Sequence, residues 1–519
     1  MKRLKYSVFT LLILLTAAGC KKSFFDINEN PNDPTEAAVT PQLLLPTVLT
    51  YTSAKMATGY DYCAFWMGYW ARSGSYGQSL PLENYDLTSS YQTLQWRNSG
   101  DANTYATTGW YNNLNDVAIM ERKAKISGLD FYVAIAKTMK SIGFMYLVDQ
   151  YNNVPYKEAF NISGTFSPKY DKAEDIYKDL IAQLDTAATL VLKSNADETP
   201  GLAESDVMFG GDSEMWLRFI NTQRLKLLLR QSQLFKSSAP TAEIAKILND
   251  GKDLAGGPFL MAGQSAEVAP GFAVDNGRMN PFWETYNLTA QGAIVDNFNR
   301  ANNYVLNKYR NNNDVRYQYF FSKARIPVDG NEYYGYNFGE ILPSPVKYRA
   351  NQSSNVAGPG LAKSATQPQW LFTSVESLFL QAEAIQRGWL TGNAPAAYSE
   401  AVHESFRWLG VDDAEAKADA YLAQNNSISN WSLAANKIDL IVMQKYLALC
   451  GVNNFEAWVD YRRLGIPRDL PLSLNPSRAS RTVPLRLIYP SDEYSYNSGN
   501  VGEQGTINAQ TSKVFWDAD

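Results

Sequence analysis

The sequence is poor in the residues that many enzymes use to move protons or to hold metal ions. Among 519 residues there is one histidine, His403. One histidine excludes a zinc site with several histidine ligands and argues against a serine–histidine–aspartate triad. His403 lies beside the apolar positions Val402 and Phe406 of a predicted helix, which favours a place on the helix flank over a role as general base. No P-loop, dinucleotide fingerprint or EF-hand loop is present. The sequence therefore predicts no catalytic residue, no metal site and no cofactor.

Positive charge is also scarce. The chain has 47 Lys and Arg against 52 Asp and Glu, a formal net charge of −5. Loss of residues 1–19, with Lys2, Arg3 and Lys5, would take the net charge to −8. Because no run of basic residues forms a local patch, nucleic acid is excluded as a partner.

Carboxylates are numerous enough to supply the pair that a glycoside hydrolase needs, but none stands out from the solvated background. Glu376 and Glu383 lie on a predicted helix with Ala382 between apolar positions. Capping and surface roles are the simplest interpretation of both. A surface-anchored glycoside hydrolase therefore stays an alternative function without a candidate pair.

The apolar run at the N-terminus is short. Val8–Leu15 is about half of the roughly 20 residues needed to cross a bilayer. Positive residues precede this run, and Ala17-Ala18-Gly19 follow it directly before Cys20. This order predicts a secretory signal peptide over 1–19 and a lipid anchor, such as palmitate, on Cys20, with no membrane-spanning helix.

Cysteine is too rare for a disulfide framework. Apart from Cys20 there are only Cys63 and Cys450, each flanked by apolar residues. Two buried free thiols are the favoured interpretation, and one disulfide between them is the alternative.

Helical signals dominate after an Asn- and Pro-rich stretch that ends near residue 40. Residues 20–40 read as a flexible tether, and 41–519 as a single α-rich body. Asp171 and Thr373 are predicted to open capping boxes, and Ser213 is a predicted cap. Amphipathic helices joined by short turns predict an all-α fold of tetratricopeptide-like hairpins forming a superhelical scaffold. The helices are expected over 173–191, 213–235, 374–388, 395–409, 438–449 and 455–464.

Three irregular stretches, about 60–105, 255–365 and 466–519, interrupt these helices and predict a long loop-rich face. They are rich in Gly, Asn, Pro and aromatic residues. Aromatic faces stack on sugar rings or peptide side chains, so we interpret the loops together as a binding face, although any one ring could simply pack the loops. The candidate ligand-binding residues are Trp66, Tyr69, Trp70, Tyr76, Trp96, Trp283 and Tyr286.

Several segments in order along the chain carry a family resemblance. They are Ile27–Thr35, Leu147–Tyr156, Asn280-Pro281-Phe282, Asn313–Arg316, Ser377–Gly388, Gln444-Lys445-Tyr446, Glu456–Arg463 and Pro484–Pro490. The chain resembles the SusD/RagB family of nutrient-binding outer-membrane lipoproteins, in its SusD-like branch. Asn152 and Asn153 stand where the family usually has Gly-Asp, and Val315 stands where Pro is common.

The resemblance implies a tetratricopeptide-like protein anchored by lipid to the outer membrane, facing the cell surface. Such a protein captures glycan or peptide and passes it to a SusC-like TonB-dependent transporter, without being an enzyme. Lys21 and Lys22 follow the predicted anchor, whereas surface export in such bacteria is often linked to acidic residues there. Besides a hydrolase, a tetratricopeptide-like protein-interaction scaffold remains an alternative.

Overall fold

The computed structural model describes residues 38–98, 109–161, 164–236, 238–343 and 348–518. Residues 41–519 form one compact unit, separate from a unit of residues 1–40. The predicted signal peptide, Cys20, the Lys21-Lys22 pair and the Ile27–Thr35 segment lie outside the described residues.

The N-terminal half of the compact unit is built from antiparallel helical hairpins. Helix α4 packs on α5, α5 on α6, and α6 on α8, while α2 packs across α4. Helix α5 is apolar enough to be a candidate membrane span, but 89% of its apolar window is buried inside the protein, so it is a core helix. These helices are α2 (Pro41–Thr58), α4 (Trp110–Ile126), α5 (Asp130–Tyr151), α6 (Ala173–Lys193) and α8 (Ser213–Arg230).

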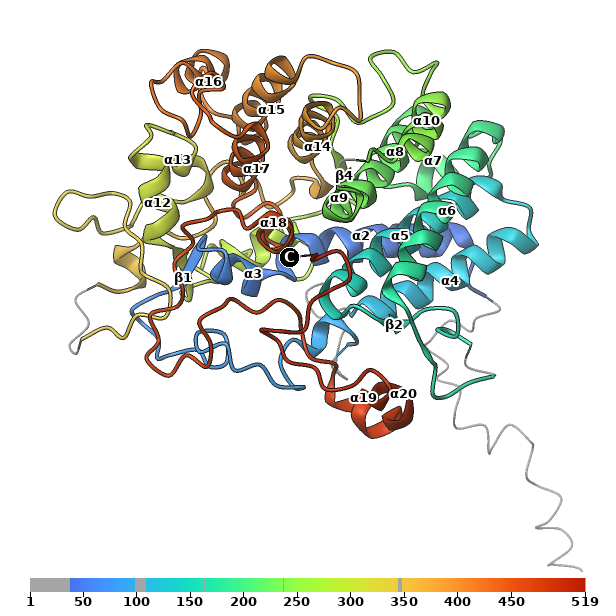
Figure 1. Cartoon of the computed structure of the whole chain (residues 1–519), viewed down its shortest axis with the longest axis horizontal. Helices are drawn as coiled ribbons and strands as arrows, with labels where there is room; N and C mark the ends of the chain where they lie inside the picture. Colours follow the sequence, from blue (N-terminus) through green and yellow to red (C-terminus); the bar gives the residue numbers. More distant parts are fainter. Residues whose placement is uncertain (1–37, 99–108, 162–163, 237, 344–347, 519) are drawn as a thin grey trace, which may run out of the picture. The chain divides into compact units, whose positions relative to one another are not determined.

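The C-terminal half repeats the same construction. Helix α14 packs on α15 and α17, and α15 packs on α16. Figure 1 shows α14, α15 and α17 beside one another above α18, close to the end of α8. The predicted all-α, tetratricopeptide-like architecture is confirmed. These helices are α14 (Ser374–Gln386), α15 (Ala394–Leu409), α16 (Ala414–Leu422), α17 (Lys437–Ala448) and α18 (Asn454–Leu464).

The other elements are short and join the irregular stretches to the helices. Strand β1 pairs antiparallel with β5, β2 with β3, and β4 with β6. The strands are β1 (Trp70–Arg72), β2 (Val154–Pro155), β3 (Tyr170–Asp171), β4 (Ala266–Val268), β5 (Asn299–Ala301) and β6 (Gln369–Phe372). The short helices are α3 (Asp61–Trp66), η2 (Thr93–Gln95), α7 (Leu202–Ser205), α9 (Ser232–Phe235), α10 (Thr241–Asp250), α11 (Pro281–Tyr286), α12 (Asn303–Arg310), α13 (Tyr317–Phe320), η4 (Ala350–Gln352), α19 (Ser491–Tyr496) and α20 (Ser498–Gly502).

The helix starts correct two of the three predicted caps. Thr373 caps α14, because its hydroxyl accepts the backbone N–H of Glu376. The cap of α8 is Asp212 rather than Ser213, since the Asp212 carboxylate accepts the N–H of Met215 at 3.0 Å. Asp171 does not cap α6; it lies in β3 and its carboxylate accepts backbone N–H groups beside β2. In the first case the cap lies one residue earlier than predicted, and in the second the carboxylate is occupied by the backbone N–H groups of Tyr156 and Lys157.

A network of buried charges joins the two halves of the fold. The ammonium of Lys226 on α8 lies 2.5 Å from a Glu376 oxygen on α14. Arg230, also on α8, lies 2.9 Å from a Glu456 oxygen on α18. The prediction of surface roles for Glu376 and Glu383 is therefore wrong: each is only 1% exposed and forms an ion pair. The apolar spacing of the helix could not reveal cations that lie some 80–150 positions away in the chain.

Candidate functional site

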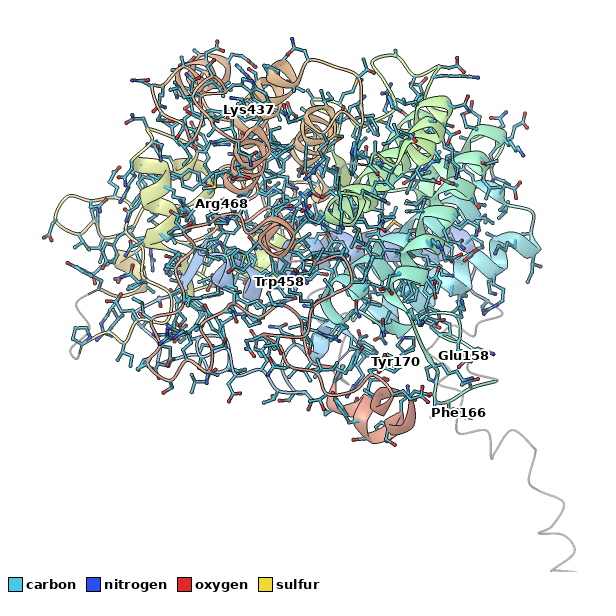
Figure 2. The ribbon with its side chains drawn as sticks, in the orientation of Figure 1. Glu158, Phe166, Tyr170, Lys437, Trp458 and Arg468 are labelled. Atoms are coloured by element: carbon cyan, nitrogen blue, oxygen red, sulfur yellow. The ribbon has the colours of Figure 1, made fainter. Side chains whose placement is uncertain are left out.

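The predicted ligand-binding rings do not lie together. Trp66 and Tyr69 are 0% exposed and Trp70 is 1% exposed, so none presents a face to solvent. Trp66 packs against Trp458, whose position in the core Figure 2 labels, with ring centroids 5.6 Å apart. Tyr69 stacks on Tyr446 at 4.5 Å. These aromatic residues build the core that joins the loops to the helices.

The remaining predicted rings are divided between three environments. Tyr286 is 3% exposed and meets the edge of Trp70 at 5.2 Å. Tyr76 is exposed and contacts Phe298, while Trp283 is half-buried against the core. Of the seven, Trp96 alone lines the cavity described next, and this ring is itself only 5% exposed. A shared concavity for these rings is therefore absent from this structure, and ligand contact by them stays a prediction.

The cavity around Trp96 has a volume of about 540 Å³, within the range of small-ligand pockets. It lies where α2, α4, the loop after β2 and the start of α19 meet. Segments distant in sequence thus form one concave surface. Its lining residues are Tyr51, Trp96, Arg97, Asn98, Tyr111, Asn112, Asn115, Asp116, Pro155, Ala159, Phe160, Pro168, Asp492 and Glu493.

Aromatic rings form one part of the cavity wall. Tyr111 lies against Trp96 with ring centroids 4.8 Å apart, and Phe160 lies 6.0 Å from Tyr111. The hydroxyl of Tyr111 donates to the carbonyl oxygen of Pro155 at 2.7 Å, which fixes the ring. Because this hydrogen bond fixes the orientation of the Tyr111 side chain, the ring is already in place for a ligand to pack against it.

Amides and carboxylates form another part of the cavity wall. The Asn112 side-chain oxygen accepts the backbone N–H of Asn98 at 2.9 Å and so joins α4 to the chain after η2. Arg97 forms an ion pair with Asp492, and Glu493 accepts the Tyr170 hydroxyl at 2.7 Å. Amides and carboxylates are groups that orient sugar hydroxyls or peptide amides.

Asp116 differs from the other carboxylates of the cavity. It lies on α4 and is half-buried. Burial raises the pKa of its carboxyl from 3.8 to about 6, and no charge on the residues that the structure describes opposes the shift. No hydrogen-bond donor or cation in the described ranges holds this carboxylate.

The sequence interpretation overlooked the polar face of α4. Asn112, Asn115 and Asp116 have the i, i+3, i+4 spacing that places side chains on one helical face. That spacing was a usable signal, but a polar face of an amphipathic helix ordinarily faces solvent. Only the packing of distant loops shows that this face lines a cavity.

Two exposed aromatic residues lie beside the cavity. Phe166 is 90% exposed and Tyr496 is 81% exposed. The side-chain hydroxyl of Ser167 donates to the Tyr496 carbonyl oxygen at 3.3 Å, so the segments that carry the two rings are in contact. Figure 2 shows Glu158 and Phe166 in the loop between β2 and β3, and Tyr170 at the start of β3, all next to the α19–α20 segment. Pro168 and Glu493, two and three residues from these rings, line the cavity itself.

The other chemical candidates from the sequence have structural roles. His403 on α15 contacts Ser399 one turn earlier, and its Nε2 lies 2.9 Å from an Asp419 oxygen on α16. Cys63 and Cys450 are buried and not bridged to each other. Over the described part of the chain, no group of three or more His, Cys, Asp or Glu residues could hold a metal ion.

Stacked helical hairpins carrying a loop-rich face define a tetratricopeptide-like helical protein. Residues 31–490 match the SusD-like family, described as starch-binding and associating with the outer membrane, and the chain belongs to that family. No curated protein sequence matches this chain.

Solved structures show the same fold. A SusD homologue from Bacteroides uniformis has a TM-score of 0.72 at 22% identity, over 92% of this chain and 99% of the other. A SusD homologue from Bacteroides fragilis has a TM-score of 0.70 at 20% identity, over 92% and 99%. A chitin-binding SusD homologue from Flavobacterium johnsoniae has a TM-score of 0.69 at 21% identity, over 91% and 98%.

Proposed function

We propose that this chain is a nutrient-binding protein of the outer membrane that captures glycan or peptide in the cavity lined by Trp96 and Tyr111. The observation that carries the proposal is the combination, in one cavity of about 540 Å³, of aromatic faces with amide and carboxylate side chains. Family membership supports a binding role, since the family is described as starch-binding.

The binding proposal is tested with residues 21–519 as a soluble protein on a glycan and peptide array. Tyr111→Leu removes the positioned ring of the cavity, and Trp283→Leu changes a half-buried ring outside it. We expect Tyr111→Leu to lose the array signal and Trp283→Leu to retain it. Equal signals from both variants, or no signal from the unmodified protein, would contradict the assignment of this cavity.

We propose further that a SusC-like TonB-dependent transporter receives the ligand. The family description places such proteins at the outer membrane, where a captured nutrient still has to cross the bilayer. Co-purification of a barrel protein with the full chain from detergent-solubilised outer membranes tests the partnership. Recovery of the chain without any such partner would contradict it.

The anchoring proposal has three parts: a signal peptide over 1–19, lipid on Cys20, and a tether over 20–40 leading to a single domain over 41–519. Metabolic labelling with a palmitate analogue should mark the chain, and Cys20→Ala should abolish the label. Protease treatment of intact cells tests whether the domain faces outward. Protection of the chain in intact cells, with digestion after lysis, would instead place it on the inner leaflet.

One observation favours glycoside hydrolysis as a second candidate function. The raised pKa of Asp116, about 6, is the kind that a general acid requires, and other carboxylates line the same cavity. Product analysis after long incubation with any bound oligosaccharide distinguishes the two functions. We expect the oligosaccharide to remain intact, whereas hydrolysis abolished by Asp116→Asn would establish an enzyme.

A further inference from the structure

The charges that line the cavity do not balance. Three carboxylates, Asp116, Asp492 and Glu493, face one guanidinium, Arg97. Arg97 is paired with Asp492. Glu493 accepts hydrogen bonds from the Tyr170 hydroxyl at 2.7 Å and from the Asn497 amide at 3.1 Å, but both donors are neutral. The carboxylates of Asp492 and Glu493 thus already outnumber the one guanidinium, and an ionised Asp116 adds to this net negative charge.

The charge of Asp116 is the one most available to a ligand. Among the residues that the structure describes, none donates to its carboxylate, and its half-buried position limits neutralisation by solvent. Among the described residues no charged group shifts the pKa of Asp116, and burial is the only cause of its rise. The groups on the cavity wall itself are Tyr51, Arg97, Tyr111, Asp492 and Glu493.

The aromatic wall has a complementary property. The faces of Trp and Tyr rings attract cations, and aromatic cages with a nearby carboxylate recognise ammonium groups. Tyr111 supplies such a face, and Tyr51 and Phe160 extend the same wall, whereas Trp96 is only 5% exposed and packs against Tyr111. The amides of Asn98, Asn112 and Asn115 add partners for hydroxyl groups. An anionic sugar would meet repulsion here, whereas an amine meets attraction from both the carboxylate and the rings.

We propose that the cavity prefers glycans with free amino groups, and that Asp116 pairs with a protonated amine of the sugar. This inference rests on the proposed binding function and specifies its ligand class. The description of the family as starch-binding favours a glycan over a lysine-containing peptide. Acidic glycans are the class that the cavity excludes.

Calorimetry at pH 6.5 with residues 21–519 tests the proposal, because Asp116 and many sugar amines are then both charged. The probes are a β-1,4-glucosamine pentamer, its N-acetylated counterpart, cellopentaose and a galacturonate pentamer. We expect the glucosamine pentamer to bind about tenfold more tightly than either neutral pentamer, and the galacturonate pentamer not to bind. Added salt should weaken the amine ligand most.

Two variants locate the effect. Asp116→Asn should lower the affinity for the glucosamine pentamer about tenfold and leave the neutral pentamers within about twofold. Asp253→Asn is the matched control, since it removes one exposed carboxylate outside the cavity, and it should change neither affinity.

Three results would overturn the amine preference. They are equal affinities for the amine and the N-acetylated pentamer, equal losses for both in Asp116→Asn, and binding of the galacturonate pentamer. If the neutral pentamers bind under the first result, the proposed binding function survives. If no pentamer binds but a lysine-containing peptide does, the amino-sugar inference fails and peptide capture takes its place. Loss of every array signal would remove the binding function itself.

Discussion

The guanidinium of Arg463 on α18 donates two hydrogen bonds to the carboxylate of Glu383 on α14, from Nη1 to Oε1 at 2.5 Å and from Nη2 to Oε2 at 2.8 Å. Both side chains are at most 2% exposed. Burial alone would raise the pKa of Glu383, but the Arg463 guanidinium outweighs it and lowers that pKa to about 2. The pair with Glu383 joins α18 to α14, and Asp460, three residues before Arg463 on α18, shares the same guanidinium.

Removal of the Glu383 charge should destabilise the fold strongly. Glu383→Gln leaves the buried Arg463 with Asp460 as its only carboxylate, and we expect a loss of roughly 3 kcal/mol in the free energy of unfolding. Urea denaturation measures the loss. The control is Glu332→Gln, which breaks an exposed pair with Lys323 and should cost less than about 1 kcal/mol. Equal losses in the two variants would show that the buried pair contributes nothing special.

Acid should abolish the contribution of Glu383 in a defined range. Because its folded pKa of about 2 lies below the ordinary value of 4.5, its contribution is complete above 4.5 and is lost as the pH falls towards 2. Denaturation of the protein and of Glu383→Gln at several pH values tests this. The difference between them should be constant above pH 5 and shrink below it; a constant difference down to pH 2 would refute the assignment.

Asp116→Asn should stabilise the protein while weakening a cationic ligand. The folded pKa of about 6 lies above the ordinary 3.8, so the ionised carboxylate lowers stability as the pH rises from 3.8 through 6. After allowance for its exposed side, we expect a gain of about 1 kcal/mol at pH 7 that vanishes below pH 4. Thermal melts at pH 4 and pH 7 check the sign. An unchanged or lower melting temperature at pH 7 would contradict it.

Substitution of Trp70 should affect stability rather than ligand contact. This ring is 1% exposed and packs on Tyr286, so Trp70→Ala should cost about 3–5 kcal/mol of unfolding free energy. Tyr111→Leu lies at the cavity and should instead cost roughly 1–3 kcal/mol of ligand binding. Melting temperature and ligand affinity, measured on both variants, separate the two effects. An unchanged melting temperature together with lost ligand affinity in Trp70→Ala would contradict this and indicate that Trp70 contacts the ligand.

The exposed rings Phe166 and Tyr496 should matter only for long ligands. Because they lie outside the cavity but next to its lining residues, an oligosaccharide must extend beyond the cavity to stack on them. We expect the double variant Phe166→Ala, Tyr496→Ala to weaken binding of an octamer severalfold and to leave a dimer unchanged. Ile126→Ala, another highly exposed apolar residue, is the control. Equal effects on both lengths would contradict the extension.

Cys63 and Cys450 should resist thiol reagents in the folded protein. They are 0% and 1% exposed, and burial raises the pKa of both thiols. In residues 21–519, reagent should label neither thiol until denaturant is added, after which two should react. Rapid labelling of the native protein would refute this burial, and labelling of fewer than two after unfolding under non-reducing conditions would indicate a disulfide.

The helices of this protein follow from local sequence, because apolar spacing and caps act within a few residues. The predicted stretch 438–449 becomes α17 (Lys437–Ala448), and 395–409 becomes α15 (Ala394–Leu409). The family resemblance also came from local segments. In the structure one of these, Glu456–Arg463, supplies Glu456, Asp460 and Arg463 to the buried charge network.

The tertiary structure alone decided which aromatic residues could meet a ligand and what surrounds them. Composition marked loops rich in rings, but a ring in a loop can pack inward as easily as outward, and Trp66, Tyr69 and Trp70 pack inward. In the sequence Asp116 is an ordinary polar residue of a helix, and only the structure shows that it lines a cavity together with Trp96 and Asp492. Neighbouring residues therefore determine the helix positions and carry the prediction of export, whereas the cavity and its charge depend on contacts between segments hundreds of residues apart.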